Sequence, residues 1–149
     1  MNIETKNLGN LELEDDKIIT FEEGIPGFEH LTRFILLEEK DSKFFYLQSI
    51  EEKEVCFVIV DPYVFVKDYA PIIKESYFEK LGGGDDSQFV LYTTVCLKKP
   101  IGESTLNLAG PLLIHMGTRL GIQVITEEKM YATKHRLVDL IEEKKRGNE

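Results

Sequence analysis

Three short apolar runs follow one another in FILLEEKDSKFFYLQSIEEKEVCFVIV, residues 34–60 of the chain. The runs at 34–37 and 44–50 are separated by a polar connection, so we expect them to form a β-hairpin. Residues 55–60 are apolar at every position, which is typical of a central strand buried on both faces. This strand should end at Asp61-Pro62, because proline lacks the N–H group that a strand ladder needs.

Similar short runs, typical of β-strands, recur on both sides of this stretch. They lie at residues 3–6, 11–13, 18–21, 89–97, 112–116 and 122–125. Helical periodicity occurs at residues 72–81, which end at three glycines, and again at residues 135–146. Many short strands with two short helices predict a mainly β protein. We expect a small single-domain antiparallel β-barrel-like fold that takes in residues 1–149.

Acidic residues outnumber basic ones and lie mostly in the first part of the chain. The 149 residues contain 27 Asp and Glu against 18 Lys and Arg, which gives a net charge of −9. Residues 1–61 contain 15 acidic and 6 basic side chains, so this segment alone carries −9 and the remainder is neutral. Such a surface repels phosphates and attracts basic partners, so we expect no direct binding to nucleic acid. The alternative interpretation is a solvated face that only improves solubility.

The sequence contains no signal for a membrane or for export. No apolar stretch approaches the ~18 residues of a membrane span, and Met1–Thr5 lacks a basic segment followed by an apolar one. We therefore expect a cytoplasmic protein that does not bind a membrane. Cys56 and Cys96 each lie in an apolar run, which predicts buried thiols, and a disulfide or redox pair is the alternative.

No pattern typical of catalysis or metal binding occurs in the sequence. The three histidines are far apart, and none has a second His or Cys at metal-ligand spacing, so we expect no metal and no cofactor. His115 follows three apolar residues, which favours a histidine in the core or at its rim. The alternative is a small enzyme or ligand-binding barrel whose groups meet only after folding, for example His115 with Asp61 and Tyr63.

Two further segments differ from ordinary connections. Residues 24–29, GIPGFE, combine two glycines with a proline, which indicates a tight loop that buries or presents Phe28. Residues 105–111, TLNLAGP, combine small residues with a proline, which indicates a β-bulge, a sheet corner or close approach to another chain. Asn107 suits either role, because its side chain can bond a bent backbone or a partner.

These segments belong to an ordered set that runs along nearly the whole chain. The set comprises FEEGIPGFE at 21–29, FYLQS at 45–49, FVIVDP at 57–62, DY at 68–69, TLNLAGP at 105–111, and QVI at 123–125 with Tyr131. In this order and at this length, the chain resembles the flagellar assembly factor family FliW. Two positions depart from the family pattern, because Gly110 stands where alanine is usual and His115 where asparagine is usual.

The resemblance implies a cytosolic, non-enzymatic protein with a β-barrel-like fold, and we expect it to be a monomer when free. It implies two partners, flagellin and the RNA-binding carbon storage regulator CsrA. Bound to the regulator, such a protein relieves the repression of flagellin translation. Bound to newly made flagellin, it is withdrawn from the regulator. A flagellin chaperone that never meets the regulator is the other interpretation.

We expect partner binding at two kinds of surface. The acidic candidates for contact with a basic regulator flank the tight loop and are Glu22, Glu23 and Glu29. An amphipathic helix of flagellin needs an apolar groove. The candidates near this groove are Phe28, Tyr63 and Phe65, which turns and prolines place at strand ends. Asn107 completes the predicted partner-binding residues.

Overall fold

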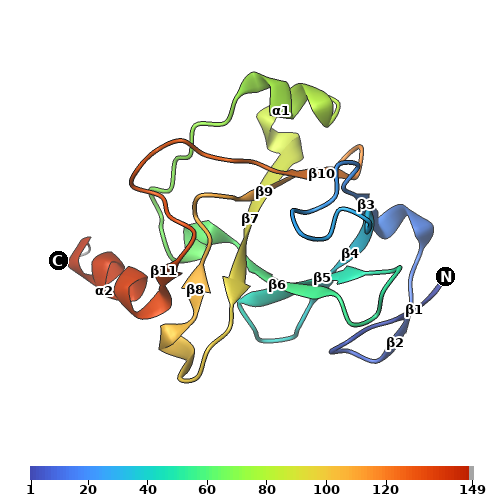
Figure 1. Ribbon diagram of the computed structural model, residues 1–149, viewed down its shortest axis with the longest axis horizontal. Helices are drawn as coiled ribbons and strands as arrows, with labels where there is room; N and C mark the ends of the chain where they lie inside the picture. The colour runs from blue at the N-terminus through green and yellow to red at the C-terminus, as the bar shows by residue number, and fades with distance from the viewer. Residues whose placement is uncertain (148–149) are drawn as a thin grey trace.

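Seven strands close into a mixed β-barrel in the computed structural model, which describes residues 1–147 (Figure 1). In order around the barrel they are β3 (Ile18–Thr20), β4 (Arg33–Glu38), β5 (Phe44–Ser49), β6 (Cys56–Val60), β7 (Phe89–Cys96), β9 (Leu112–His115) and β10 (Leu120–Gln123). Neighbours are antiparallel except for β3 and β10, which meet in parallel at Thr20 and Leu120 and close the ring. The predicted mainly β, barrel-like fold is confirmed, with this one parallel contact in addition. The last two residues of the predicted domain, 148–149, lie outside the described range.

The remaining elements extend the barrel or cover it. At the start of the chain, β1 (Asn2–Glu4) and β2 (Asn10–Glu12) form an antiparallel hairpin. Beyond the barrel, β8 (Thr105–Leu106) pairs with the end of β7, and β11 (His135–Arg136) pairs with β8. The helices are α1 (Glu75–Lys80) and α2 (Leu137–Gly147), and the 3₁₀ turns are η1 (Asp15–Lys17), η2 (Pro62–Val64), η3 (Asp86–Gln88) and η4 (Ile101–Glu103).

Alternate side chains of the barrel strands fill its interior, because successive residues of a strand point to opposite faces. Phe34 of β4, Leu47 of β5 and Ile59 of β6 are fully buried in this cluster. Phe21, just after β3, meets the Phe34 ring edge to face, with 5.6 Å between the ring centroids. The intervening residues, such as Ile35, face outward from the barrel. Their apolar side chains must therefore be buried by elements that pack on its outer surface.

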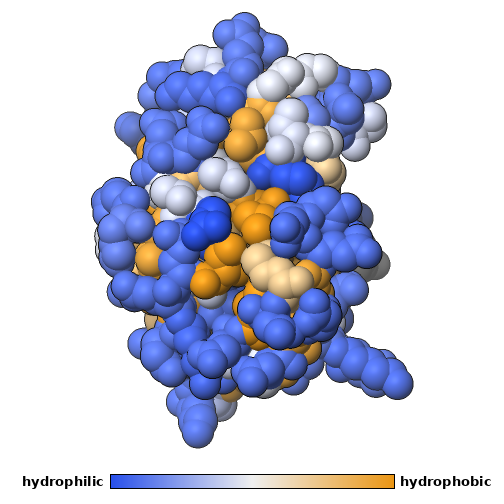
Figure 2. All heavy atoms as spheres, turned by 90° about the vertical axis from the view of Figure 1, so that its right-hand side faces the viewer, coloured by the Kyte–Doolittle hydropathy of each residue, from blue (hydrophilic) through white to orange (hydrophobic). Residues whose placement is uncertain are grey.

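Three covers bury the outward-facing apolar side chains of the barrel. The β1–β2 hairpin packs on Ile35 and Leu37 of β4. Helix α2 packs on a cluster that contains Val60 and Val95, and α1 packs on a cluster that contains Leu113. Figure 2 faces the side that carries the hairpin, where hydrophilic residues surround a narrow strip of hydrophobic ones.

The helix predicted at residues 72–81 is shorter than expected, because α1 begins three residues later. Ile72 lies outside it and is 74% exposed, and its N–H donates to the Glu128 side chain instead of starting a helical face. The predicted end of the helix is confirmed. Gly82 and Gly83 have φ of 110° and 62°, and their N–H groups bond carbonyls of the last helical turn.

The helix predicted at residues 135–146 begins two residues later than expected, at Leu137. His135 and Arg136 pair with β8 as a short strand before the chain turns into the helix. The Leu137 N–H then donates to the Ser104 carbonyl at 2.9 Å, so the start of α2 is fixed by the neighbouring segment.

The prediction of two buried thiols is wrong for Cys96. It is exposed because it lies beyond Thr94, where the pairing of β7 with β6 stops, whereas the preceding Val95 is buried in the cluster under α2. Cys56 is half-buried, and burial raises the pKa of its thiol. Both thiols are free.

The barrel interior leaves no room for a side chain at Gly121 of β10. A Cβ atom there would lie 2.7 Å from the Phe21 ring, which is fully buried. We predict that Gly121→Ala lowers the free energy of unfolding by about 1–3 kcal/mol, the usual cost of overpacking a core. Urea denaturation measures this change. The control is Gly147→Ala in α2, where a Cβ atom would meet nothing within 4 Å. Equal stability of Gly121→Ala and the wild type would contradict the prediction.

Candidate functional site

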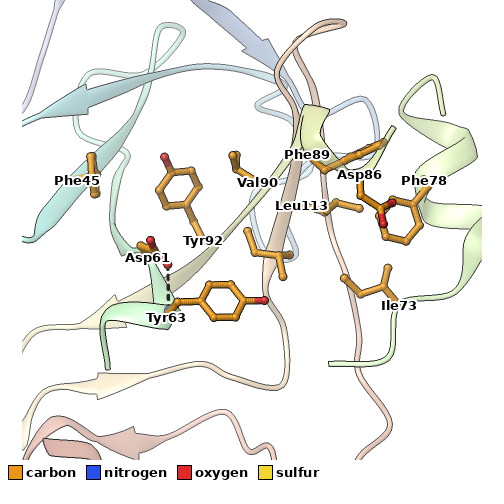
Figure 3. Close-up of a pocket in the computed structure, with 11 residues that line it drawn as sticks. Phe45, Asp61, Tyr63, Ile73, Phe78, Asp86, Phe89, Val90, Tyr92 and Leu113 are labelled. Carbon is orange, nitrogen blue, oxygen red and sulfur yellow. Dashed lines mark hydrogen bonds between the residues drawn. The ribbon is translucent and has the colours of Figure 1, made fainter. Parts of the chain in front are cut away.

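An open apolar groove of about 480 Å³ lies beside the first half of β7 (Figure 3). Its lining residues are Phe45, Asp61, Tyr63, Ile73, Phe78, Asp86, Phe89, Val90, Leu91, Tyr92 and Leu113. Figure 3 shows Phe45 and Tyr92 toward one end, and Ile73 and Phe78 toward the other. We call this hollow the seam groove, because it lies where β6 and β7 stop pairing.

The seam groove exists because the ladder between β6 and β7 is short. In the described chain, only Ile59 and Val60 of β6 pair with β7, opposite Thr94 and Thr93. If the same register continued, Pro62 would stand opposite Leu91 of β7. Proline has no N–H to donate to the ladder, so the pairing does not continue. The chain turns away there into η2, which separates the two strands.

The turn away from the ladder is held by Asp61. Its Oδ1 atom accepts the Tyr63 N–H at 2.9 Å, which caps η2. Tyr63 is thereby left 42% exposed at the groove. The sequence prediction that β6 ends at Asp61-Pro62 is confirmed.

The seam groove is apolar with negative charge in its lining. Of the residues that line it, only Asp61 and Asp86 carry a charge. Burial raises the pKa of Tyr63, and the Asp61 carboxylate raises it further. Burial likewise raises the pKa of Tyr92. Both hydroxyls therefore stay neutral at physiological pH, and the groove is suited to an apolar segment with positive charge.

The three aromatic residues predicted to lie near one groove are not brought together. Tyr63 lines the seam groove, as described above. Phe28 is half-buried against the barrel core, where its ring meets Phe57 edge to face at 5.2 Å between centroids. Phe65 is buried in the cluster under α2. A partner-binding role for Phe28 or Phe65 stays a prediction.

The three predicted acidic residues share one surface beside α1 and β10. Glu22 and Glu23 line one hollow there, Glu23 and Glu29 line an adjoining one, and Lys80 lines both. Glu23 pairs with Lys80 at 3.6 Å. The Gly27 N–H donates to Glu29 and lowers the pKa of its carboxyl. We call these three residues the acidic loop surface.

The tight loop between these carboxylates requires glycine at position 24. Gly24 has a φ of 71°, and a Cβ atom there would lie 2.5 Å from the Glu29 backbone. The loop therefore closes on itself, with Ile25 buried and Glu29 exposed. This is the tight loop that the sequence predicted, and it fixes the position of the acidic loop surface.

The segment at residues 105–111 is the predicted bulge. Leu106 pairs with Val95, and Leu112 pairs with Tyr92. The chain therefore advances six residues from Leu106 to Leu112 while β7 advances only three, which is the mark of a bulge. Within this bulge, the Asn107 Oδ1 atom accepts the Gly110 N–H at 2.9 Å. The side chain of Asn107 therefore holds the bend, as one of its two predicted roles required.

Gly110 lies close to a side chain of β10, Gln123. A Cβ atom at this position would lie 2.7 Å from the Gln123 Nε2 atom. That amide donates to the Gly110 carbonyl at 2.9 Å. Glycine leaves the space for this bond, which ties the bulge to β10.

His115 has a structural position rather than a place in the seam groove. It is 3% exposed, and its Nδ1 atom accepts the N–H groups of Gly117 and Thr118 at 2.9 and 3.1 Å. The other ring nitrogen, Nε2, therefore carries the proton and donates to the Gly83 carbonyl at 3.0 Å. The structure thus does not join His115 to Asp61 and Tyr63, and the prediction of a core or rim histidine is confirmed.

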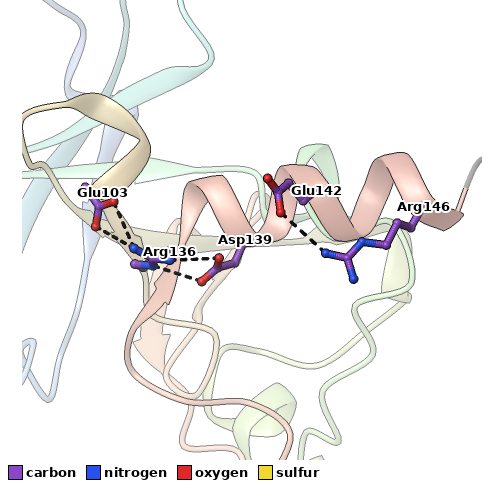
Figure 4. Close-up of polar contacts among 5 residues, drawn as sticks. All are labelled: Glu103, Arg136, Asp139, Glu142 and Arg146. Carbon is purple, nitrogen blue, oxygen red and sulfur yellow. Dashed lines mark hydrogen bonds and ion pairs between the residues drawn. The ribbon is translucent and has the colours of Figure 1, made fainter.

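A second cluster of charges lies at the start of α2 (Figure 4). Arg136 bonds both oxygens of Glu103 at 3.0 Å and also bonds Asp139, at 3.1 Å from its Nε atom. The Arg136 guanidinium holds the pKa of the Asp139 carboxyl below its ordinary value. These bonds fasten η4 to α2, so the cluster is explained by the fold.

Within residues 1–147, no group of three or more His, Cys, Asp or Glu side chains is placed to hold a metal ion. No helix in that range is long and apolar enough to cross a membrane.

Comparison with known proteins places this architecture in a family. The family model described as "FliW protein" matches residues 2–137. The chain belongs to the FliW family of flagellar assembly factors. A FliW protein of Anoxybacillus flavithermus is 39% identical over 137 residues, which cover 92% of this chain and 94% of that one. A FliW protein of Alkaliphilus metalliredigens is 36% identical over 144 residues, with 95% and 89% covered.

A solved structure agrees with this assignment. The crystal structure of a flagellar assembly factor FliW matches with a TM-score of 0.86 and 34% identity, over 92% of this chain and 96% of that one. FliW proteins form a non-enzymatic family, and the resemblance seen in the sequence is confirmed. The sequence did not indicate that Ile73, Phe78 and Phe89 would join Tyr63 in the seam groove. Only the Pro62 signal, which ends β6, pointed to an opening there.

The Asn107 bond in the bulge can be tested by substitution. We predict that Asn107→Ala lowers the free energy of unfolding by about 1–3 kcal/mol, because the Gly110 N–H loses its acceptor. Asn107→Asp keeps an acceptor oxygen at the same position and serves as the control. Chemical denaturation of the three proteins measures the difference. An alanine variant as stable as the wild type would show that the bond contributes nothing to folding.

Proposed function

We propose that this FliW protein is a protein-binding regulator of flagellum assembly in the cytoplasm, with flagellin and the RNA-binding regulator CsrA as its partners. By binding CsrA it relieves the repression of flagellin translation, and newly made flagellin withdraws it from CsrA. The observation that carries the proposal is the presence of two exposed surfaces of different chemistry, the acidic loop surface and the apolar seam groove.

The acidic loop surface is suited to the RNA-binding partner. A protein that binds RNA carries Lys and Arg for the phosphates, and these side chains are complementary to exposed carboxylates. Glu22, Glu23 and Glu29 are exposed on a loop whose backbone is fixed by Gly24. A fixed loop loses little conformational entropy on binding, which favours association.

The seam groove is suited to flagellin. A segment with apolar side chains gains free energy by covering exposed Tyr63 and the apolar walls around it. Because the acidic loop surface and the seam groove have no lining residue in common, each can be changed without changing the other. Exchange between the two partners then requires either contact between them or a coupling of the two surfaces through the barrel.

A pull-down of the full chain against purified flagellin and purified CsrA tests the proposal directly. Both proteins should bind, and flagellin in excess should release CsrA. Tyr63→Ala should weaken flagellin binding with a small effect on CsrA binding. The control is Met130→Ala, another exposed apolar residue, which does not line the groove. Binding of flagellin without CsrA would support a flagellin chaperone and overturn the regulatory part of the proposal.

We predict that association with CsrA is accelerated by negative charge. The Debye length falls from about 30 Å at 0.01 M salt to about 8 Å at 0.15 M, so the association rate constant should fall clearly over this range. Stopped-flow or surface plasmon resonance measures the rate constant. A rate constant that does not change with salt would contradict electrostatic attraction.

The contact itself is tested by changing the acidic loop surface to lysine. Reversal of Glu22, Glu23 and Glu29 should weaken CsrA binding and leave the melting temperature nearly unchanged, because these side chains are exposed. A control reversal of three exposed carboxylates outside the loop, Glu4, Glu38 and Glu54, makes the same change in net charge. Equal effects of the two reversals would mean that the acidic contact lies elsewhere.

A further inference from the structure

We infer that the seam groove binds an extended segment of a partner protein, which pairs with the exposed edge of β7 as an additional strand. The segment has apolar side chains in its centre and Lys or Arg at its ends. This inference concerns how the groove binds, and it rests on the proposed function only in taking flagellin as the source of the segment.

The hydrogen-bond pattern of β7 shows which of its backbone groups are free. The Met116 N–H donates to the Gln88 carbonyl at 2.8 Å, and these two residues stand opposite each other in the register of β7 and β9. Paired residues that exchange bonds alternate with pairs that do not, so Val90 and Tyr92 bond to β9. The backbone groups of Phe89 and Leu91 therefore point the other way, toward the seam groove.

The free groups form a short open edge. The Phe89 N–H is taken by the Asp86 carbonyl at the end of η3. The Phe89 carbonyl and both backbone groups of Leu91 remain, since the ladder to β6 covers only Thr93 and Thr94 in the described chain. An extended peptide can satisfy these groups with its own backbone, as peptides do when they add to a sheet edge. A helix has no free backbone groups along its length and leaves the edge unpaired.

The side walls of the seam groove fit alternating side chains. A strand added beside β7 points its side chains to the same two faces as β7 does. On one face they meet Phe45 and Tyr92, and on the other they meet Tyr63 and Ile73. The open edge from Phe89 to Tyr92 corresponds to about four to six residues of an extended peptide, at a rise of about 3.3 Å each.

Two carboxylates flank this edge and determine the charge of the segment. In the register of β6 and β7, Asp61 stands level with Tyr92, and Asp86 precedes Phe89 at the other end. Lys or Arg at the two ends of a bound segment would meet these carboxylates. A second copy of this chain is disfavoured at the edge, because each copy carries −9 and would bring the same aspartates together.

Selection of random peptides displayed on phage against the full chain tests the inference. We expect the selected peptides to have apolar centres, Lys or Arg at their ends and no central proline. Their binding should weaken about tenfold or more in the variant Tyr63→Ala, and less in Met130→Ala. Asp61→Asn keeps the acceptor that caps η2 and removes only the charge. This variant, combined with Asp86→Asn, should weaken binding and reduce its dependence on salt.

Methylation of single backbone nitrogens in a selected peptide distinguishes a strand from a helix. A bound strand turns every second N–H toward β7, so methylation should abolish binding at alternate positions and be tolerated at the positions between. Selected peptides with apolar residues at helical spacing, or methylation effects without this alternation, would overturn the inference. Failure to select any peptide that needs Tyr63 would also overturn it.

Competition with flagellin separates this inference from the proposed function. A selected peptide that displaces flagellin supports both. A selected peptide that passes the methylation test but leaves flagellin bound supports the strand site and overturns the assignment of flagellin to it.

Discussion

The barrel depends on one point of closure, the parallel contact between β3 and β10. The Thr20 N–H donates to the Arg119 carbonyl there, at 2.9 Å, and no longer ladder joins these two strands within the described residues. One residue further along each strand, Gly121 lies against the Phe21 ring that fills the interior. The closing contact and the filling of the interior therefore lie side by side, because the residue after Leu120 must be glycine to leave space for the Phe21 side chain. The hairpin and both helices cover a barrel that this contact completes.

Most of the fold could be predicted because its signals are local. Alternation of apolar residues places the strands, and the proline at position 62 and the glycines after α1 end the elements that precede them. The predicted helix boundaries are wrong where a segment distant in the sequence contributes to the local structure. Ile72 lies outside the predicted helix, with its N–H bonded to Glu128, and His135 forms a short strand because it pairs with β8. Neither partner can be found from the residues around these positions.

The candidate site could be predicted only in part, for a similar reason. The loop glycines identified an exposed acidic turn, since polar residues around a tight turn stay in solvent whatever packs behind them. The strand end at Pro62 placed Tyr63 at an opening, but Phe65 followed the same signal and is buried under α2. A 3₁₀ turn rotates successive side chains by about a third of a turn, so neighbours point in different directions. Whether Tyr63 or Phe65 is exposed to solvent depends on α2, which lies more than 70 residues later in the sequence.

The closing contact also has a consequence for the order in which the protein forms during its synthesis. Thr20 and Leu120 are one hundred residues apart, so the ring cannot close before the ribosome has released most of the chain. Contacts between residues so far apart in the sequence are slow to form. Until β10 pairs with it, β3 keeps an unpaired edge to which a strand of another unfinished chain could add. The first 61 residues, which wait longest, carry the whole net charge of −9. Repulsion between nascent chains thus protects the strands from one another while the barrel is still an open sheet.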